Sequence, residues 1–205
     1  MDRLSLRRLS GFAAMRRNAR VFVLCLCSAI AACTHAAADG KLSDVRLQDA
    51  SGATRSLQSY AGKIVVLVFW SFKCPVSLAY IDRMQALADR YAGRGTVIFG
   101  VASNENETAE EIRANVSHLN ISVPILLDAE GALAQGFGAT HTPEAFVLDS
   151  AGVLRYRGPI DNNKRTGERG RIAYIENALD SLLSGKAVTP SEVRPFGCPI
   201  RRKGQ

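Results

Sequence analysis

Cysteine is the residue type in this 205-residue sequence that offers the clearest chemistry. Cys25 and Cys27 lie in an apolar run near the start, Cys33 follows that run, and Cys74 and Cys198 lie far downstream. The thiolate form of cysteine is a nucleophile, and two thiols that meet in a fold can form a disulfide. Which of these chemistries applies depends on the segments that position each cysteine.

Cys74 lies at the junction of a predicted buried strand and a predicted helix. Residues 63–70 form a continuous apolar run, and apolar residues recur at helical spacing over residues 78–91. Pro75 suits the first turn of that helix because it has no N–H group to leave unpaired. Free N–H groups and the positive dipole end at a helix N-terminus favour a thiolate, and Lys73 adds a positive charge nearby. We therefore expect Cys74 to be a nucleophile with a lowered pKa; the alternative is a small buried apolar residue.

Cys74 has no second thiol within its own turn. Ser77 stands where a Cys-x-x-Cys motif would place the second cysteine. Ser77 can hydrogen-bond the thiolate, but a mixed disulfide on Cys74 must be resolved from elsewhere. Three interpretations of Cys198 stay open: it resolves Cys74, it forms a structural disulfide with Cys74, or it is free or pairs between molecules.

Residues 1–38 have the order of a secretory signal. Three arginines precede an apolar run over residues 21–30, which is too short to span a bilayer, and small residues follow. The segment ending at Cys33 is typical of a bacterial lipobox, in which that cysteine is lipidated and anchors the protein. Three alanines at residues 36–38 suit an ordinary signal peptidase instead. Both patterns predict an exported protein, either periplasmic or a membrane-anchored lipoprotein facing the periplasm, where disulfides persist.

The distribution of charge argues against nucleic-acid binding. Of the formal net charge of +7, residues 1–33 carry +5, from six arginines and one aspartate, so the remainder is nearly balanced. His141 could join the two downstream thiols in a soft metal site, but no closely spaced Cys or His pair supports one. We expect no nucleic-acid partner, no metal and no cofactor.

Residues 39–187 are predicted to form one α/β domain, and residues 188–205 a tail that carries Cys198. Strands alternate with helices, which favours a mostly parallel sheet covered on both sides. A closing antiparallel hairpin and helix narrow this to a thioredoxin-like fold with a central mixed β-sheet flanked by helices. Thr108 and Glu111 have the spacing of a capping box. The expected strands span residues 45–49, 63–70, 96–102, 123–127, 145–149 and 153–157, and the expected helices residues 78–91, 108–119, 131–137 and about 172–182.

Several motifs share one family resemblance. They are Phe69-Trp70 before Cys74-Pro75, the stretches at residues 100–104, 138–149 and 156–161, and the terminal residues 196–200. Together they resemble the redoxin group, which includes the alkyl hydroperoxide reductase/thiol-specific antioxidant proteins and their thioredoxin-like relatives. The sequence is most similar to an exported peroxiredoxin-like subgroup, over about residues 43–203. The resemblance implies a thioredoxin fold with Cys74 in the active-site turn.

Departures from the family pattern bear on the reaction. Peroxiredoxins place a Thr or Ser three residues before the peroxidatic cysteine, where this chain has Ser71, and a Pro seven residues before it, where this chain has Leu67. Thr142-Pro143 replaces a peroxidatic arginine and resembles the cis-proline of thioredoxins, whose preceding backbone pairs with substrate peptide. The resemblance therefore implies a cis bond and a substrate-binding role for Thr142 and Pro143, with a plain loop as the alternative.

The function that we expect is a thiol-dependent oxidoreductase. Cys74 would attack a peroxide or a disulfide-bearing protein, Cys198 would resolve the product, and an external thiol would be the reductant. Peroxide is slightly favoured because Cys-x-x-Cys is missing. The alternative is a non-catalytic module that binds an extended peptide at Thr142-Pro143 and carries a structural Cys74–Cys198 disulfide. The residues expected to support the active site are Ser71, Lys73, Pro75 and Ser77.

Overall fold

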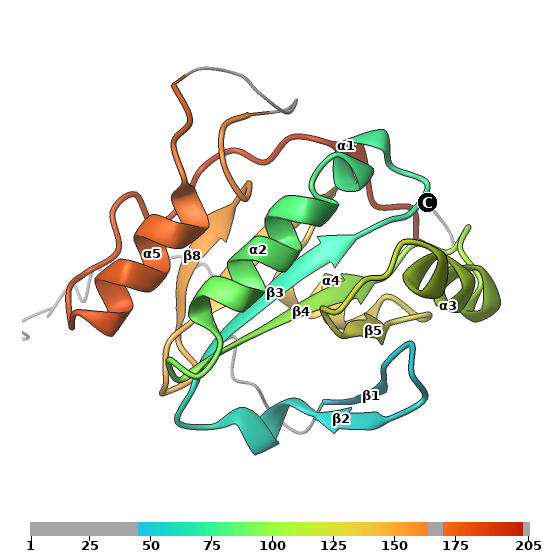
Figure 1. Ribbon diagram of the computed structural model, residues 1–205, viewed down its shortest axis with the longest axis horizontal. Helices are drawn as coiled ribbons and strands as arrows, with labels where there is room; N and C mark the ends of the chain where they lie inside the picture. Colours follow the sequence, from blue (N-terminus) through green and yellow to red (C-terminus); the bar gives the residue numbers. More distant parts are fainter. Residues whose placement is uncertain (1–44, 164–169, 203–205) are drawn as a thin grey trace, which may run out of the picture. The chain divides into compact units, whose positions relative to one another are not determined.

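The computed structural model describes residues 45–163 and 170–202 (Figure 1). The chain divides into two compact units, Met1–His35 and Ala36–Gln205, and the described residues all belong to the second. The predicted signal segment and the lipidation site Cys33 lie outside the described residues. Within the described part of the chain, no helix is long and apolar enough to cross a membrane.

A five-stranded sheet forms the centre of the described unit, with the strand order β5-β4-β3-β7-β8 (Figure 1). β3 (Ile64–Trp70), β4 (Thr96–Ala102) and β5 (Ile125–Leu127) are parallel to one another, whereas β7 (Glu144–Leu148) is antiparallel to β3 and to β8 (Leu154–Gly158). The expected mixed sheet is thus confirmed. All residues of β3 are buried, because this middle strand is covered on both faces.

Alternate residues of β3 pack into two apolar layers. The even-numbered side chains face the layer that contains α2 (Ile81–Tyr91), α3 (Ala109–His118) and α5 (Tyr174–Leu183). The odd-numbered side chains face the layer that contains α4 (Ala132–Phe137). Because successive side chains of a strand point to opposite faces, β3 packs against both helical layers. The remaining elements are β1 (Arg46–Gln48), β2 (Thr54–Ser56), the 3-10 helix η1 (Leu57–Tyr60), α1 (Pro75–Leu78), β6 (His141–Thr142) and β9 (Cys198–Pro199).

Two expected helix boundaries are wrong. The helix expected over residues 78–91 is broken into α1 and α2, because Tyr80 turns inward and its hydroxyl donates a hydrogen bond to the buried carboxylate of Asp161. Leu78 is consequently 40% exposed. The last helix begins at Tyr174, and Ile172 lies before it, 46% exposed instead of facing the sheet. The capping box of α3 is confirmed.

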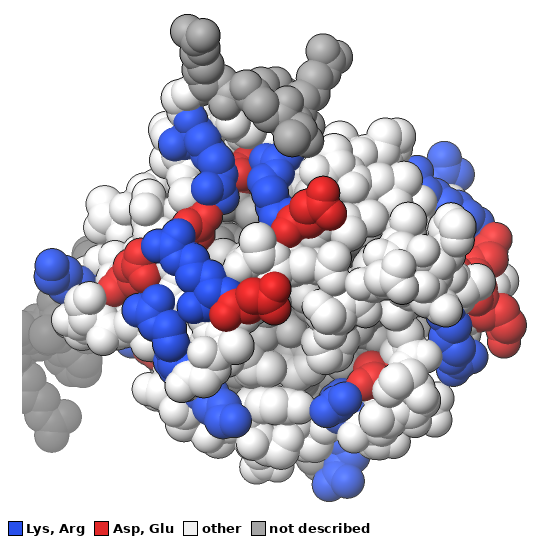
Figure 2. Space-filling view, viewed as in Figure 1, with Lys and Arg blue, Asp and Glu red and all other residues white. Residues whose placement is uncertain are grey.

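Positive and negative side chains are interspersed on the face shown in Figure 2. Arg90 and Arg171 both pair with Glu176, at 2.5 Å each, and Arg83 pairs with Asp161 at 2.9 Å. These ion pairs tie α2 to α5 and to the segments that flank α5.

Candidate active site

Cys74 is the N-cap residue of α1, directly after the loop that follows β3. Pro75 occupies the first helical position, as expected, and the Cys74 side chain is 1% exposed. The main-chain N–H of Cys74 donates to the carbonyl of Ser71 at 3.3 Å. The Cys74 thiol donates to the carbonyl oxygen of Thr142 at 3.0 Å. The site therefore joins the start of α1 to β6.

The Thr142–Pro143 peptide bond is cis, which confirms that expectation. The fully buried carboxylate of Glu144 accepts hydrogen bonds from the N–H groups of Thr140 (2.7 Å) and His141 (3.1 Å), and pairs with Arg157 at 3.2 Å. Glu144 thus fixes the loop so that the Thr142 carbonyl faces Cys74. The sequence reasoning missed Glu144, because one carboxylate at the start of an apolar strand has no motif around it.

Cys198 reaches the same site from the end of the chain. β9 pairs antiparallel with β6, and Cys198 lies opposite Thr142. Both cysteines are free thiols, and the Cys198 thiol hydrogen-bonds the Cys74 sulfur. The structure therefore places the two thiols together as a reduced pair.

Gly197 permits the close approach of the two strands. Its φ is +137°, and a Cβ atom at this position would lie 2.1 Å from the carbonyl oxygen of Thr142 and 2.8 Å from its carbonyl carbon. Both the backbone conformation and the available space exclude a side chain here. In the sequence, Gly197 is visible only as a member of the terminal motif over residues 196–200, which does not indicate its role.

The tail is bound to the domain on both sides of Cys198. Before it, Val193 donates to the carbonyl of Arg157 on β8 at 3.0 Å. After it, Ile200 donates to the carbonyl of Thr140 at 2.9 Å, and the N–H of Arg201 donates to the side chain of Asn104 at 2.8 Å. Figure 1 shows this tail, in red, running from α5 across the top of the view toward α1 and α3. The tail is thus an integral part of the fold.

The two thiols have opposite pKa shifts. For Cys74, burial is the largest influence and raises the pKa. Hydrogen bonds from the Cys198 thiol, from Ser77 and from the Thr142 hydroxyl outweigh it, so the pKa lies below its ordinary value. For Cys198, burial together with the hydrogen bond and charge of Cys74 raises the pKa to about 11. Cys74 is therefore the thiol that ionises first, and Cys198 retains the proton.

Ser77 is buried beside Cys74, and within the described part of the chain its hydroxyl has no hydrogen-bond partner. It still lowers the pKa of the Cys74 thiol, through its backbone N–H first and its hydroxyl second. A hydroxyl rotates freely and can donate to a thiolate once that thiolate forms.

Ser71 and Lys73 shape the loop before Cys74. The Ser71 hydroxyl accepts the N–H of Lys73 at 3.1 Å. The Lys73 ammonium binds the carboxylate of Glu111 at 3.1 Å and the carbonyl of Asn106. The positive charge that we expected near the thiol is therefore directed toward α3, and the influences that lower the Cys74 pKa are hydrogen bonds.

Glu107 holds this loop through a hydrogen bond and was not identified from the sequence. Its side chain is 9% exposed, and one carboxylate oxygen accepts the N–H of Phe72 at 2.7 Å. The second oxygen has no partner among the described residues. From the sequence, the acidic stretch over residues 105–111 predicts a solvated helix start. Nothing in this pattern indicates that Glu107 turns inward.

No group of three or more His, Cys, Asp and Glu side chains in the described part of the chain is arranged to hold a metal ion. The Nδ1 atom of His141 shares a hydrogen bond with the Thr140 hydroxyl at 2.9 Å.

A cysteine between a buried strand and a helix, with a cis-proline opposite, is the arrangement of a thioredoxin-fold protein. The model of the AhpC/TSA family matches residues 38–157, more than half of the sequence, and the chain belongs to this family. This confirms the redoxin resemblance.

Several proteins of similar sequence are named as thioredoxin-like proteins or thiol-disulfide oxidoreductases. The chain is 29% identical over 112 residues to "Thioredoxin-like protein YneN" of Bacillus subtilis, covering 55% of this chain and 65% of that protein. It is 26% identical to "Thiol-disulfide oxidoreductase ResA" of Geobacillus thermodenitrificans, over 55% of this chain and 63% of that protein. The chain therefore spans less than two thirds of these relatives. A hypothetical protein of Sinorhizobium meliloti 1021 superposes with a TM-score of 0.72 at 28% identity, over 82% of this chain and 95% of that one.

Proposed function

We propose that this chain is a thiol–disulfide oxidoreductase whose redox-active pair is Cys74 and Cys198. The observation that carries the proposal is the pairing of β9 with β6, which brings the Cys198 thiol to the Cys74 sulfur. Membership in the AhpC/TSA family and similarity to a protein named thiol-disulfide oxidoreductase support it.

In the first step, the Cys74 thiolate attacks one sulfur of a disulfide-bearing protein. A mixed disulfide forms, the substrate disulfide breaks, and one substrate sulfur leaves as a thiolate. The hydrogen bonds that lower the pKa of Cys74 increase the fraction of thiolate that can make this attack.

In the second step, Cys198 resolves the mixed disulfide. Its proton passes to the departing substrate thiolate, its sulfur attacks the Cys74 sulfur, and the second substrate thiolate leaves. The first substrate thiolate takes up the proton that Cys74 released to solvent on ionising. The substrate thus gains two electrons and two protons, and the protein ends as a Cys74–Cys198 disulfide. An external thiol then returns the pair to the dithiol state.

Peroxide is the second candidate substrate. A sulfenate formed on Cys74 would be resolved by Cys198 to the same disulfide, with release of water. We now place disulfides first because similar proteins are named thioredoxin-like protein and thiol-disulfide oxidoreductase, and because the cis Thr142–Pro143 bond stands where peroxiredoxins have an arginine. This reverses the slight preference drawn from the sequence.

We further infer that the protein acts outside the cytoplasm. The proposal rests on the signal-like order of residues 1–38 and on the lipobox ending at Cys33. It is consistent with a dithiol pair that must be able to form a disulfide. Mass spectrometry of the protein isolated from its native membrane fraction tests it: a diacylated Cys33 at the N-terminus supports the lipoprotein form, and an intact leader contradicts export.

A single-turnover experiment tests the reaction. The reduced protein is mixed with a disulfide-bonded protein or with hydrogen peroxide, quenched by alkylation, and analysed by mass spectrometry. We expect the disulfide to oxidise the pair, Cys198→Ser to accumulate a mixed disulfide on Cys74, and Cys74→Ser to be inert. Faster oxidation by stoichiometric peroxide than by the protein disulfide would favour the peroxidase. A Cys74 that stays unmodified in excess of both oxidants would overturn the enzymatic proposal in favour of a peptide-binding module.

A further inference from the structure

A polar pocket opens beside Cys198. It has a volume of about 200 Å³ and is lined by the loop before Cys74, by Asn104 and Asn106 after β4, and by Cys198 and Arg201 of the tail. This is smaller than the usual pocket for a drug-sized ligand, so it suits a small molecule or one end of a larger one.

The two thiols are not equally accessible from this pocket. Cys74 is 1% exposed and lies beneath the tail, whereas Cys198 is partly exposed and forms part of the pocket wall. A reactant that enters the pocket therefore meets the Cys198 sulfur first.

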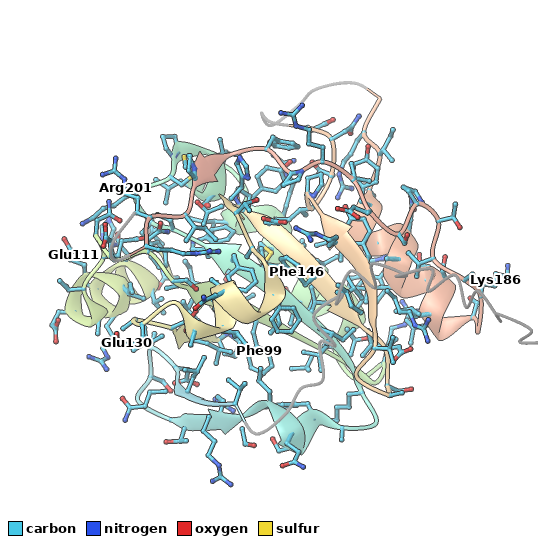
Figure 3. The ribbon with its side chains drawn as sticks, turned by 180° about the vertical axis from the view of Figure 1, so that it is seen from behind. Phe99, Glu111, Glu130, Phe146, Lys186 and Arg201 are labelled. Atoms are coloured by element: carbon cyan, nitrogen blue, oxygen red, sulfur yellow. The ribbon has the colours of Figure 1, made fainter. Side chains whose placement is uncertain are left out.

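The pocket presents hydrogen-bond donors and positive charge. The Arg201 side chain is exposed and forms no ion pair within the described residues. The Asn104 side chain is 6% exposed; its oxygen accepts the N–H of Arg201, and its Nδ2 has no hydrogen-bond partner among the described residues. Lys73 also lines the pocket, although Glu111 shares its charge. Figure 3 shows Arg201 and Glu111 at the same end of the molecule. A guanidinium beside an unpaired amide N–H matches a carboxylate.

We infer that this pocket binds the carboxylate of a low-molecular-weight thiol, which reduces the Cys74–Cys198 disulfide by attacking Cys198. The inference rests on the proposed function, because it names the external reductant of that same pair.

The reduction proceeds by two thiol–disulfide exchange steps. The incoming thiolate forms a bond to the Cys198 sulfur, the Cys74–Cys198 bond breaks, and its electron pair leaves on Cys74 as a thiolate. A second small thiol then attacks the small-molecule sulfur of the mixed disulfide, and Cys198 leaves and takes up a proton. Two small thiols become one small disulfide. Cys74 is the better leaving group because the thiol of lower pKa departs faster.

Three small thiols that differ in charge test the inference. The oxidised protein is reduced by 3-mercaptopropionate (anionic), 2-mercaptoethanol (neutral) or cysteamine (cationic), and each rate is divided by that thiol's rate with a free small disulfide. We expect the anionic thiol to be favoured over the neutral one by about two- to fivefold, as for a solvent-exposed ion pair, and the cationic thiol to be disfavoured. Arg201→Gln should remove the preference, and Asn104→Asp, which keeps an acceptor for the Arg201 N–H, should reverse it.

Arg155→Gln, on the β7–β8 hairpin, is the matched control for the lost charge and should leave the preference intact. Equal normalised rates for the three thiols, a preference that survives Arg201→Gln, or a first mixed disulfide on Cys74 would each overturn the inference. Failure of the proposed function is distinguishable, because no Cys74–Cys198 disulfide would then form before any small thiol is added.

Discussion

At the residue scale, the pair is organised by the hydrogen bond between its two sulfurs. The Cys198 thiol donates to the Cys74 sulfur, which favours the thiolate at Cys74, and the resulting charge then opposes ionisation of Cys198. In the proposed reaction, the same contact favours Cys74 as the nucleophile and keeps Cys198 protonated until it attacks. This division of roles needs no Cys-x-x-Cys spacing; it needs only that the two thiols meet.

Removing the Cys198 thiol should raise the pKa of Cys74. In Cys198→Ala the hydrogen bond to the thiolate is lost, and we expect the pKa to rise by about one unit, the typical effect of one hydrogen bond to a charged group. The pH dependence of Cys74 alkylation by iodoacetamide measures this. In Cys198→Ser, which keeps a hydrogen-bond donor, the pKa of Cys74 should lie between those of Cys198→Ala and the wild type. An unchanged midpoint in Cys198→Ala would contradict the hydrogen bond between the two sulfurs.

Glu107 should stabilise the loop before Cys74 through a single hydrogen bond. Glu107→Ala leaves the N–H of Phe72 without its acceptor, and we expect the free energy of unfolding to fall by about 1–3 kcal/mol. Glu107→Gln retains an acceptor oxygen and should recover most of that loss. Urea denaturation of the three reduced proteins provides the comparison, and equal losses in both variants would exclude this role.

At the element scale, the site depends on two strands of two residues each. β6 is positioned by the cis Thr142–Pro143 bond and by Glu144, and β9 by hydrogen bonds of the tail to β8 and to Asn104. β9 occupies the edge beside Cys74 at which thioredoxins are expected to pair with substrate peptide. A protein substrate must therefore displace the tail, or approach past it, to reach Cys74.

Gly197→Ala should separate the two thiols while leaving both in the chain. The new Cβ would overlap the Thr142 carbonyl and force β9 away from β6. We expect formation of the Cys74–Cys198 disulfide to slow by about tenfold or more, which is roughly 1.4 kcal/mol in the barrier. Alkylation of Cys74 by a bulky maleimide should become faster, because the tail no longer covers it.

Gly136→Ala is the matched control for this substitution. Gly136 lies in α4, and a Cβ there would meet no atom within 4 Å, so both rates should stay at the wild-type value. Unchanged disulfide formation in Gly197→Ala would show that the close approach of the strands does not position the thiols.

The sequence predicts the local features of this fold better than its long-range contacts. β3 follows from its apolar run, α3 from its capping box, and the cis bond at Pro143 from a family resemblance. The approach of Cys198 to Cys74 was among the expectations, but the pairing of β6 with β9 that produces it was not, since two-residue strands have no periodicity and their residues are far apart in the chain. The inward orientation of Tyr80 and Glu107 could not be predicted either, because each depends on a hydrogen-bond partner that is distant in the sequence.

At the scale of the whole described unit, the tail belongs to both core layers. Phe196 packs against the layer of α2 and α5, and Ile200 is buried in the layer of α4. Cys198 lies between these two anchors, so its position over Cys74 depends on the packing of the domain. The redox-active pair should consequently exist only in the folded protein.

The stability of the reduced protein should fall between about pH 9 and pH 11. The pKa of Cys198 is about 11 in the folded state and near its ordinary value of 9.0 when unfolded, so the unfolded chain releases this proton first and is favoured as the pH rises. Cys74 acts in the opposite sense: its lowered pKa stabilises the folded state at alkaline pH, and this contribution is lost as the pH falls through the folded pKa. Denaturant unfolding of the reduced and the oxidised protein from pH 7 to 11 separates these thiol effects from other groups, since the disulfide has no proton to release. Parallel pH profiles of the two forms would contradict the shifted pKa values.

The most direct test is to equilibrate the folded protein with mixtures of reduced and oxidised dithiothreitol and to map its cysteine peptides by mass spectrometry. We predict a peptide in which Cys74 and Cys198 are linked with the loss of two hydrogen atoms, which forms and disappears reversibly and is absent from Cys74→Ser and Cys198→Ser. A Cys74 that remains a thiol under oxidising mixtures, or that holds a stable mixed disulfide while Cys198 stays free, would contradict the pairing of the two thiols.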